Sequence, residues 1–217
     1  MSCASVIPTE IFYHKFGQGI FFETYFNKTT RGFFVECGAY DGETYSNTLE
    51  LEVHHGWTGL LIEANPLTFR DLLTKSRNVY TLNTCLSTER HPVIMNYKLS
   101  GDRSGLSNWH NAADVQNMPR SLQIQCLPLY SILAAIKDLG HSAIDLFSLD
   151  VEGAEVPILE SLPLDKTDVR NFLIETKVPH DKRRSRQKRR TIEDMLGKAG
   201  YKTVDTPFHI DVLMTKE

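Results

Sequence analysis

Acidic and glycine residues gather at three points of the sequence, each directly after an apolar run that is typical of a buried strand. The first point is a glycine-rich turn, and its candidate binding residues are Glu36, Gly38, Ala39, Tyr40, Asp41 and Gly42. Glycine allows a sharp turn and lets a ligand approach the backbone closely. The turn lacks the GxGxxG spacing of a dinucleotide loop, which favours a cofactor without a pyrophosphate.

The second point is Glu63 with Ala64 and Asn65, and Glu63 lies 21 residues beyond Gly42. At the tip of a second strand, an acidic side chain can accept hydrogen bonds from both ribose hydroxyls. Taken alone, an acidic residue at a strand end such as Glu63 is more often a solvated or helix-capping group. Together with the first turn, it predicts an adenosine-type cofactor.

The third point places Asp150, Glu152 and Glu155 within six residues, after the apolar run IDLFSL. Carboxylates this close are costly to ionise together unless they bind something or share a proton. We therefore predict catalytic roles for Asp150 and Glu152. The alternative is that Glu152 and Glu155 only occupy the first turn of a helix, where the helix dipole favours them.

Short apolar runs alternate with segments of helical period, which predicts an α/β fold with a parallel sheet and crossover helices. We expect strands at residues 32–37, 57–62, 78–82, 144–149 and 171–174, helices at 43–54, 66–76, 129–139, 155–162 and 191–199, and a closing hairpin at 201–214. We expect a single domain over residues 1–217. Residues 1–30 would form a helical extension, and residues 86–125 an insertion over the acceptor site.

The charge of this 217-residue chain is unevenly distributed. Residues 182–190 (KRRSRQKRR) hold seven of the 24 basic residues, so 17 basic residues face 27 acidic ones elsewhere. We interpret this basic segment as a solvated loop before a helix at Thr191, or as a site for an anionic partner such as a membrane surface or an acidic protein. Nucleic acid is the minority interpretation, because no aromatic residues are interleaved.

No run reaches the roughly 18 apolar residues of a membrane-spanning helix, and no leader pattern precedes the domain. We therefore expect a cytoplasmic protein, or one associated with secretory-pathway membranes if the sequence is a piece of an anchored protein. The cysteines Cys3, Cys37, Cys85 and Cys126 are widely spaced, without a CxxC pair. This spacing predicts reduced, mostly buried thiols rather than a disulfide or a metal site.

Three blocks carry a family resemblance: FFVECGAYDGETYSNTLELE, GWTGLLIEANP and IDLFSLDVEGAEVPIL. They resemble the FkbM-type S-adenosylmethionine-dependent methyltransferases, in the order of that family and over roughly residues 32–175. The SNT and GW variants are similar to the branch that includes the animal Star proteins, which are trafficking factors.

The resemblance implies a class I methyltransferase sheet, Rossmann-like and seven-stranded, mostly parallel with an antiparallel closing hairpin and helices on both faces. It implies S-adenosyl-L-methionine as cofactor and S-adenosyl-L-homocysteine as product. The implied cofactor residues are Glu36, Gly38, Ala39, Asp41 and Gly42 at the methionine part, Glu63 at the ribose, Ala64 and Asn65 at the adenine, and Asp150 near the methyl group. Tyr40 stands where many relatives have Asn, which leaves one polar cofactor contact in question.

The expected reaction is O-methylation of a small hydroxylated molecule or a glycan, with Asp150 or Glu152 removing the hydroxyl proton. A divalent metal on Asp150 and Glu175 is a minority alternative, because two separated carboxylates are thin evidence. The alternative function is a non-catalytic, Star-like trafficking or interaction module that keeps the fold.

Overall fold

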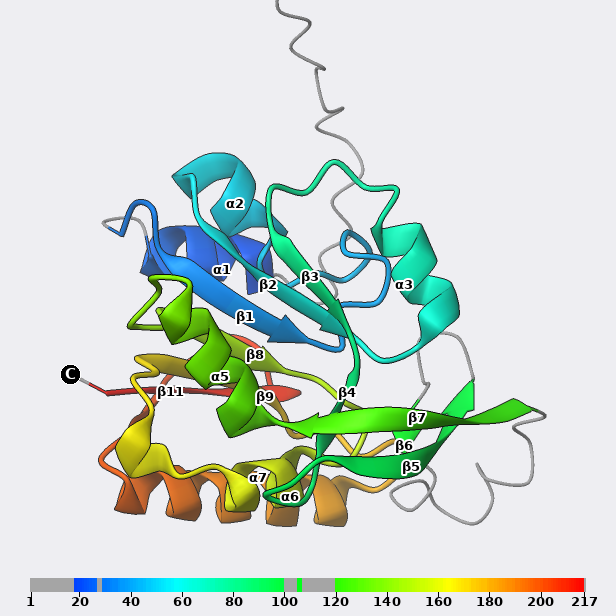
Figure 1. Cartoon of the computed structure of the whole chain (residues 1–217). Helices are drawn as coiled ribbons and strands as arrows, with labels where there is room; N and C mark the ends of the chain where they lie inside the picture. Colours follow the sequence, from blue (N-terminus) through cyan, green and yellow to red (C-terminus); the bar gives the residue numbers. More distant parts are fainter. Residues whose placement is uncertain (1–17, 27–28, 100–104, 107–119, 217) are drawn as a thin grey trace, which may run out of the picture.

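A seven-stranded sheet forms the centre of the computed structural model, which describes residues 18–26, 29–99, 105–106 and 120–216 (Figure 1). Its strands, in spatial order, are β10 (Lys202–Val204), β11 (Asp211–Thr215), β9 (Asn171–Glu175), β8 (Leu146–Leu149), β1 (Phe33–Cys37), β2 (Thr58–Glu63) and β3 (Tyr80–Asn83). The five strands from β9 to β3 are parallel, whereas β11 runs antiparallel to β9 and to β10. The predicted sheet and its antiparallel closing hairpin are confirmed.

Both faces of the sheet are covered because its strands are apolar on both sides. On one face, Phe34, Leu61 and Leu146 pack with α1 (Gln18–Tyr25), α2 (Leu49–His55) and α3 (Pro66–Leu72). On the other face, Val35, Ile62 and Phe147 pack with α5 (Leu129–Asp138), α6 (Glu155–Ser161) and α7 (Lys182–Lys198). The short 3₁₀ helix η2 (Leu164–Lys166) follows α6. The three layers bring the carboxyl ends of β1, β2 and β8 to one edge.

A second sheet of four strands occupies much of the region predicted as an insertion. It comprises β4 (Cys85–Ser87), β7 (Arg120–Pro128), β5 (Val93–Leu99) and β6 (Gly105–Leu106), in this spatial order. The strands β5 and β7 form a long antiparallel ribbon that projects beyond the main sheet (Figure 1). Residues 100–104 and 107–119 of the insertion lie outside the described residues, as do residues 1–17 of the N-terminal extension.

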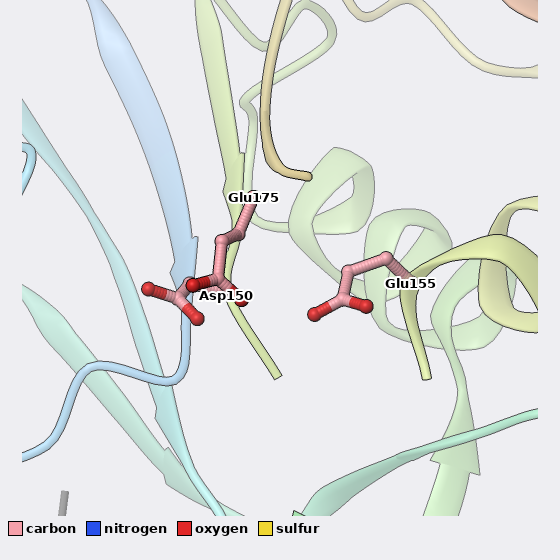
Figure 2. A group of neighbouring side chains, drawn as sticks. All are labelled: Asp150, Glu155 and Glu175. Atoms are coloured by element: carbon pink, nitrogen blue, oxygen red, sulfur yellow. The ribbon is translucent and has the colours of Figure 1, made fainter. Parts of the chain in front are cut away.

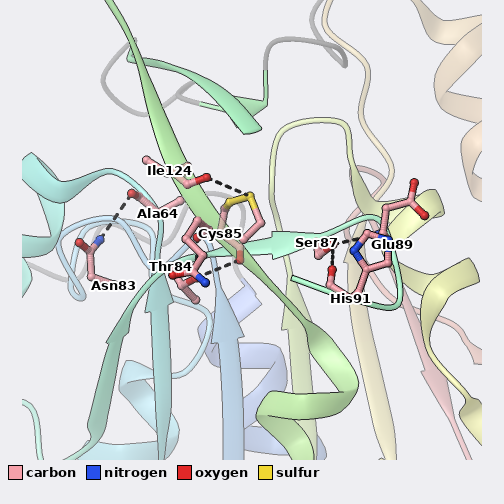
Figure 3. Close-up of a disulfide and its surroundings, with 10 residues drawn as sticks. Ala64, Asn83, Thr84, Cys85, Ser87, Glu89, His91 and Ile124 are labelled. Atoms are coloured by element: carbon pink, nitrogen blue, oxygen red, sulfur yellow. Dashed lines mark hydrogen bonds between the residues drawn. A yellow bond between two sulfur atoms is a disulfide. The ribbon is translucent and has the colours of Figure 1, made fainter. Parts of the chain in front are cut away.

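The prediction of reduced cysteines is wrong for one pair, because Cys85 and Cys126 form a disulfide (Figure 3). The two residues are direct partners in the parallel pairing of β4 with β7, and their Cα atoms lie 4.4 Å apart. A separation of 41 residues gives no hint of this pairing in the sequence. Cys37 is a buried free thiol, as predicted, and Cys3 lies outside the described residues.

The interpretation of the basic segment as a loop is also wrong, because Lys182–Lys198 is one continuous helix. Asp181 caps its first turn by accepting a hydrogen bond from the Arg184 amide at 2.9 Å. The apolar residues that anchor this helix, Ile192 and Leu196, lie in its second half. The first half of the helix has no apolar residues at helical spacing, so no signal in the sequence indicated that it is helical.

Among the described residues, no helix has both the length and the apolar character needed to cross a bilayer.

Candidate active site

A pocket opens at the carboxyl ends of β1, β2 and β8, where the second sheet meets the main one. Eight of the eleven predicted site residues line it: Glu36, Gly38, Ala39, Tyr40, Glu63, Ala64, Asp150 and Glu152. In open α/β sheets, ligands bind beyond the carboxyl ends of the strands. The pocket therefore occupies the edge at which the strand-end residues were expected to meet.

The turn after β1 is in direct backbone contact with the residue that follows β8. The amide of Asp150 donates to the carbonyl of Cys37 at 3.1 Å, and Gly38 has a φ of 82°. A Cβ atom on Gly38 would lie 1.8 Å from the carbonyl oxygen of Asp150. Only glycine fits here, so the first and third acidic points are held in contact by the backbone.

Glu63 connects the second strand end to the first turn. Its Oε2 accepts a hydrogen bond from the Tyr40 amide at 2.8 Å, and its Oε1 accepts one from the Asn65 amide at 2.6 Å. The side chain is buried at the pocket wall. Burial raises the pKa of Glu63, although the amides of Asn65 and Tyr40 oppose this shift.

Glu36 is held by the loop that leads into α2. Its Oε1 accepts from the Asn47 amide at 2.8 Å, and its Oε2 accepts from Ser46 Oγ at 2.9 Å and from Thr48 Oγ1 at 2.5 Å. The Asn47 side chain also lines the pocket and donates to Ser148 Oγ at 3.0 Å. The Ser-Asn-Thr segment therefore orients a buried carboxylate and joins β1 to β8.

A buried arginine holds the same loop from outside the pocket. Arg77 pairs with Glu52 at 2.6 Å, donates to the carbonyl of Gly42, and reaches Thr48 Oγ1 at 3.2 Å. Sequence reasoning missed this residue, because one arginine in a polar stretch shows no pattern.

The third acidic point forms a cluster with Glu175 of β9 (Figure 2). Carboxylate oxygens of Asp150, Glu155 and Glu175 lie within 4.8 Å of one another. The ammonium of Lys188 on α7 lies 2.6 Å from Glu155 Oε2 and 4.0 Å from Glu175 Oε2. Burial, followed by the negative charges of the neighbouring carboxylates, raises the pKa of Glu175 to about 10. The folded chain therefore favours the protonated form of Glu175.

The pocket lies in a segment that is shared with known proteins. The family model described as the methyltransferase FkbM domain matches residues 36–203. The chain belongs to the FkbM methyltransferase family. No curated protein matches the sequence.

Solved structures share the fold of this FkbM domain at low sequence identity. A protein from Staphylococcus aureus described as a caffeoyl-CoA O-methyltransferase is 9% identical with a TM-score of 0.50, and the match covers 92% of this chain and 82% of that one. A methyltransferase from Pyrococcus furiosus is 12% identical with a TM-score of 0.47, covering 91% and 82%. A SAM-dependent methyltransferase from Aquifex aeolicus is 10% identical with a TM-score of 0.47, covering 93% and 90%. At these identities the likeness concerns the fold alone.

Three predicted residues of the FkbM domain do not line the pocket. The Asp41 carboxylate accepts from the Thr44 amide at 2.7 Å and from Thr44 Oγ1 at 2.8 Å, and so closes its own turn. Burial alone would raise the pKa of Asp41, but the hydrogen bonds from Glu43 and Thr44 lower this pKa below its usual value. Gly42 packs beside Leu72, and Asn65 caps α3 through the Leu67 amide at 3.0 Å. Their predicted cofactor contacts stay predictions.

Some pocket residues of the FkbM domain were not singled out from the sequence. Tyr97 of β5, within the predicted insertion, lines the pocket together with Thr84 and Cys85, which directly precede that insertion. Burial, and then the charges of Glu63 and Glu152, raise the pKa of Tyr97 well above its usual value. The phenol therefore stays protonated and can donate a hydrogen bond inside the pocket.

A divalent cation fits the acidic cluster of the FkbM domain only in part. Three carboxylates offer the oxygen ligands that Mg²⁺ prefers. However, the ammonium of Lys188 already lies against Glu155 and near Glu175, so a second cation would be repelled.

Proposed function

We propose that this chain is an S-adenosylmethionine-dependent methyltransferase that methylates a hydroxyl of a small molecule or a glycan. The observation that supports this function best is the pocket, which collects Glu63, the Gly38 turn and Asp150 from three strand ends. Membership of the FkbM family points in the same direction.

In this proposal Glu63 binds the ribose hydroxyls, and the turn from Glu36 to Tyr40 surrounds the methionine part. The cofactor supplies a methyl group that its sulfonium has already activated. The chain has to align an acceptor hydroxyl and accept its proton. Asp150 and Glu152 are the carboxylates proposed for this proton, and Tyr45, which is 42% exposed at the pocket, offers a ring to the acceptor.

Changing Glu63 to alanine should weaken the binding of S-adenosylmethionine by about tenfold or more, because charged hydrogen bonds of about 1.5–3 kcal/mol are lost. Isothermal titration of the wild type and Glu63→Ala measures the effect. Glu160→Ala, an exposed glutamate on α6, is the matched control and should bind like the wild type. A wild type that binds neither the cofactor nor S-adenosylhomocysteine would refute the proposed function. Binding without methyl transfer to a broad panel of acceptors would favour the non-catalytic, Star-like module.

We also propose that the first half of α7 binds an anionic partner. Five of its seven basic residues are exposed: Lys182, Arg183, Arg184, Arg186 and Arg190. Closely spaced cations attract anionic surfaces, by about 1 kcal/mol per residue at a membrane.

The triple change of Arg183, Arg186 and Arg190 to glutamine should therefore reduce binding to phosphatidylserine vesicles by about tenfold or more, and should flatten its dependence on salt. Vesicle sedimentation measures this, with the exposed Lys198→Gln at the other end of α7 as control. Equal binding by the triple variant and the wild type would remove this interpretation. A titration with single-stranded RNA shows whether the partner is a nucleic acid instead.

A further inference from the structure

One cation of the basic segment points inward. The side chain of Lys188 is only 10% exposed, and its Nζ lies 2.6 Å from Glu155 Oε2. The neighbouring Arg189 pairs with Glu193 at 2.9 Å and donates to the carbonyl of Asp211 at 3.1 Å, so it is directed elsewhere. Lys188 therefore interacts with the protein interior, whereas the exposed cations beside it face solvent.

Its partner Glu155 holds the turn that carries the acidic pocket residues. Glu155 is completely buried, and its Oε1 accepts from the amides of Val151 at 3.2 Å and Gly153 at 3.1 Å. Within this turn, Glu152 has a φ of 57°, a conformation that L-residues rarely adopt. Such a turn persists only when its surroundings hold it.

We propose that Lys188 is a positioning residue, which pairs with the buried Glu155 so that the Glu155 carboxylate holds the Asp150–Gly153 turn against the pocket. The inference deepens the proposed function, because it concerns the residues that would receive the acceptor's proton. A chain of contacts therefore links α7 to the pocket wall. Lys188 of α7 pairs with Glu155, and Glu155 accepts hydrogen bonds from two backbone amides of the turn.

The charges around Glu155 explain why a cation is required. Asp150, Glu152 and Glu175 all face this region, and each ionised carboxylate disfavours the ionised form of the others. Removing Lys188 would take away the ammonium that lies 2.6 Å from the buried Glu155 carboxylate and leave that charge beside other carboxylates. Breaking a buried ion pair in this way is strongly destabilising, so the turn would loosen.

The test is the affinity for S-adenosylhomocysteine, measured by isothermal titration on four proteins. These are the wild type, Lys188→Met, the double variant Lys188→Met/Glu155→Gln, and the control Lys198→Met from the exposed end of α7. We expect Lys188→Met to bind about tenfold more weakly than the wild type, because the buried Glu155 charge is left unpaired. In the double variant, a neutral glutamine accepts the two amide hydrogen bonds without a buried charge, so the affinity should recover.

A general loss of stability would not produce this pattern. If Lys188→Met binds as tightly as the wild type, or if adding Glu155→Gln does not restore the affinity of Lys188→Met, the proposal is overturned. If Lys188→Met does not fold, the double variant should still fold and bind S-adenosylhomocysteine. A double variant that does not fold or bind would also overturn the proposal. If the wild type binds no ligand, the proposed function fails, and the unfolding of the same variants by urea still tests Lys188. Lys188→Met should then be less stable than the double variant, and the opposite order would overturn the inference.

Discussion

Replacing Gly38 with alanine should destabilise the folded chain by more than about 4 kcal/mol, or prevent folding altogether. Two effects add at this position. The backbone has a φ of 82°, which disfavours a residue with a side chain by about 1–2 kcal/mol. The new Cβ would also lie 1.8 Å from the carbonyl oxygen of Asp150, and a backbone atom cannot move away without shifting β8. Urea unfolding, or soluble yield where the protein does not fold, measures the loss.

Gly56→Ala is the matched control for this change. Gly56 ends α2 with a φ of 64°, but nothing lies within 4 Å of its added Cβ. This variant should lose only the cost of the left-handed backbone, about 1–2 kcal/mol. The difference between the two variants therefore isolates the clash with Asp150. Similar losses in both would mean that the close approach of the two strand ends does not constrain the fold.

Glu175→Gln should become more stable than the wild type as the pH rises from 5 to 9. In the folded chain the pKa of Glu175 is raised from 4.5 to about 10, so the folded state keeps a proton that the unfolded state has released. The wild type therefore loses stability as the pH rises through this window, by up to about 1.4 kcal/mol per pH unit. The amide cannot titrate, and this contribution is absent from the variant.

The measurement is the free energy of unfolding of the two proteins at several pH values, compared as a difference so that other titrating groups cancel. The exposed Glu160→Gln is the control, and its difference from the wild type should stay level. If the difference in unfolding free energy between Glu175→Gln and the wild type also stays constant with pH, Glu175 is ionised in the folded chain and the prediction is wrong.

The sheet was predictable because both signals that specify it are local. Buried parallel strands appear as continuous apolar runs, and glycine and acidic residues mark their carboxyl ends. Gly38, Glu63 and Asp150 were found in this way, and the structure brings all three to one pocket. Asp41 belongs to the same glycine-rich turn, but it hydrogen-bonds within that turn and does not line the pocket.

The contacts between distant segments could not be predicted. Lys188 looks like its exposed neighbours in the sequence, and only the packing of α7 against α6 turns it towards Glu155. Asn47 belongs to a motif that was recognised, but its bond to Ser148 spans 101 residues. Tyr97 reaches the pocket through the pairing of β5 with β7, in which it lies opposite Leu122, a residue distant in the sequence.

The bridge between Cys85 and Cys126 gives the pocket wall two covalent states. Cys85 lines the pocket, and it is directly followed along β4 by Leu86, a further lining residue. Disulfides persist in secretory and extracellular compartments, whereas glutathione and thioredoxin keep thiols reduced in the cytosol. A chain made in the cytosol would therefore present two thiols where an exported chain presents a cross-link. The covalent structure of the pocket wall would then differ between the two compartments.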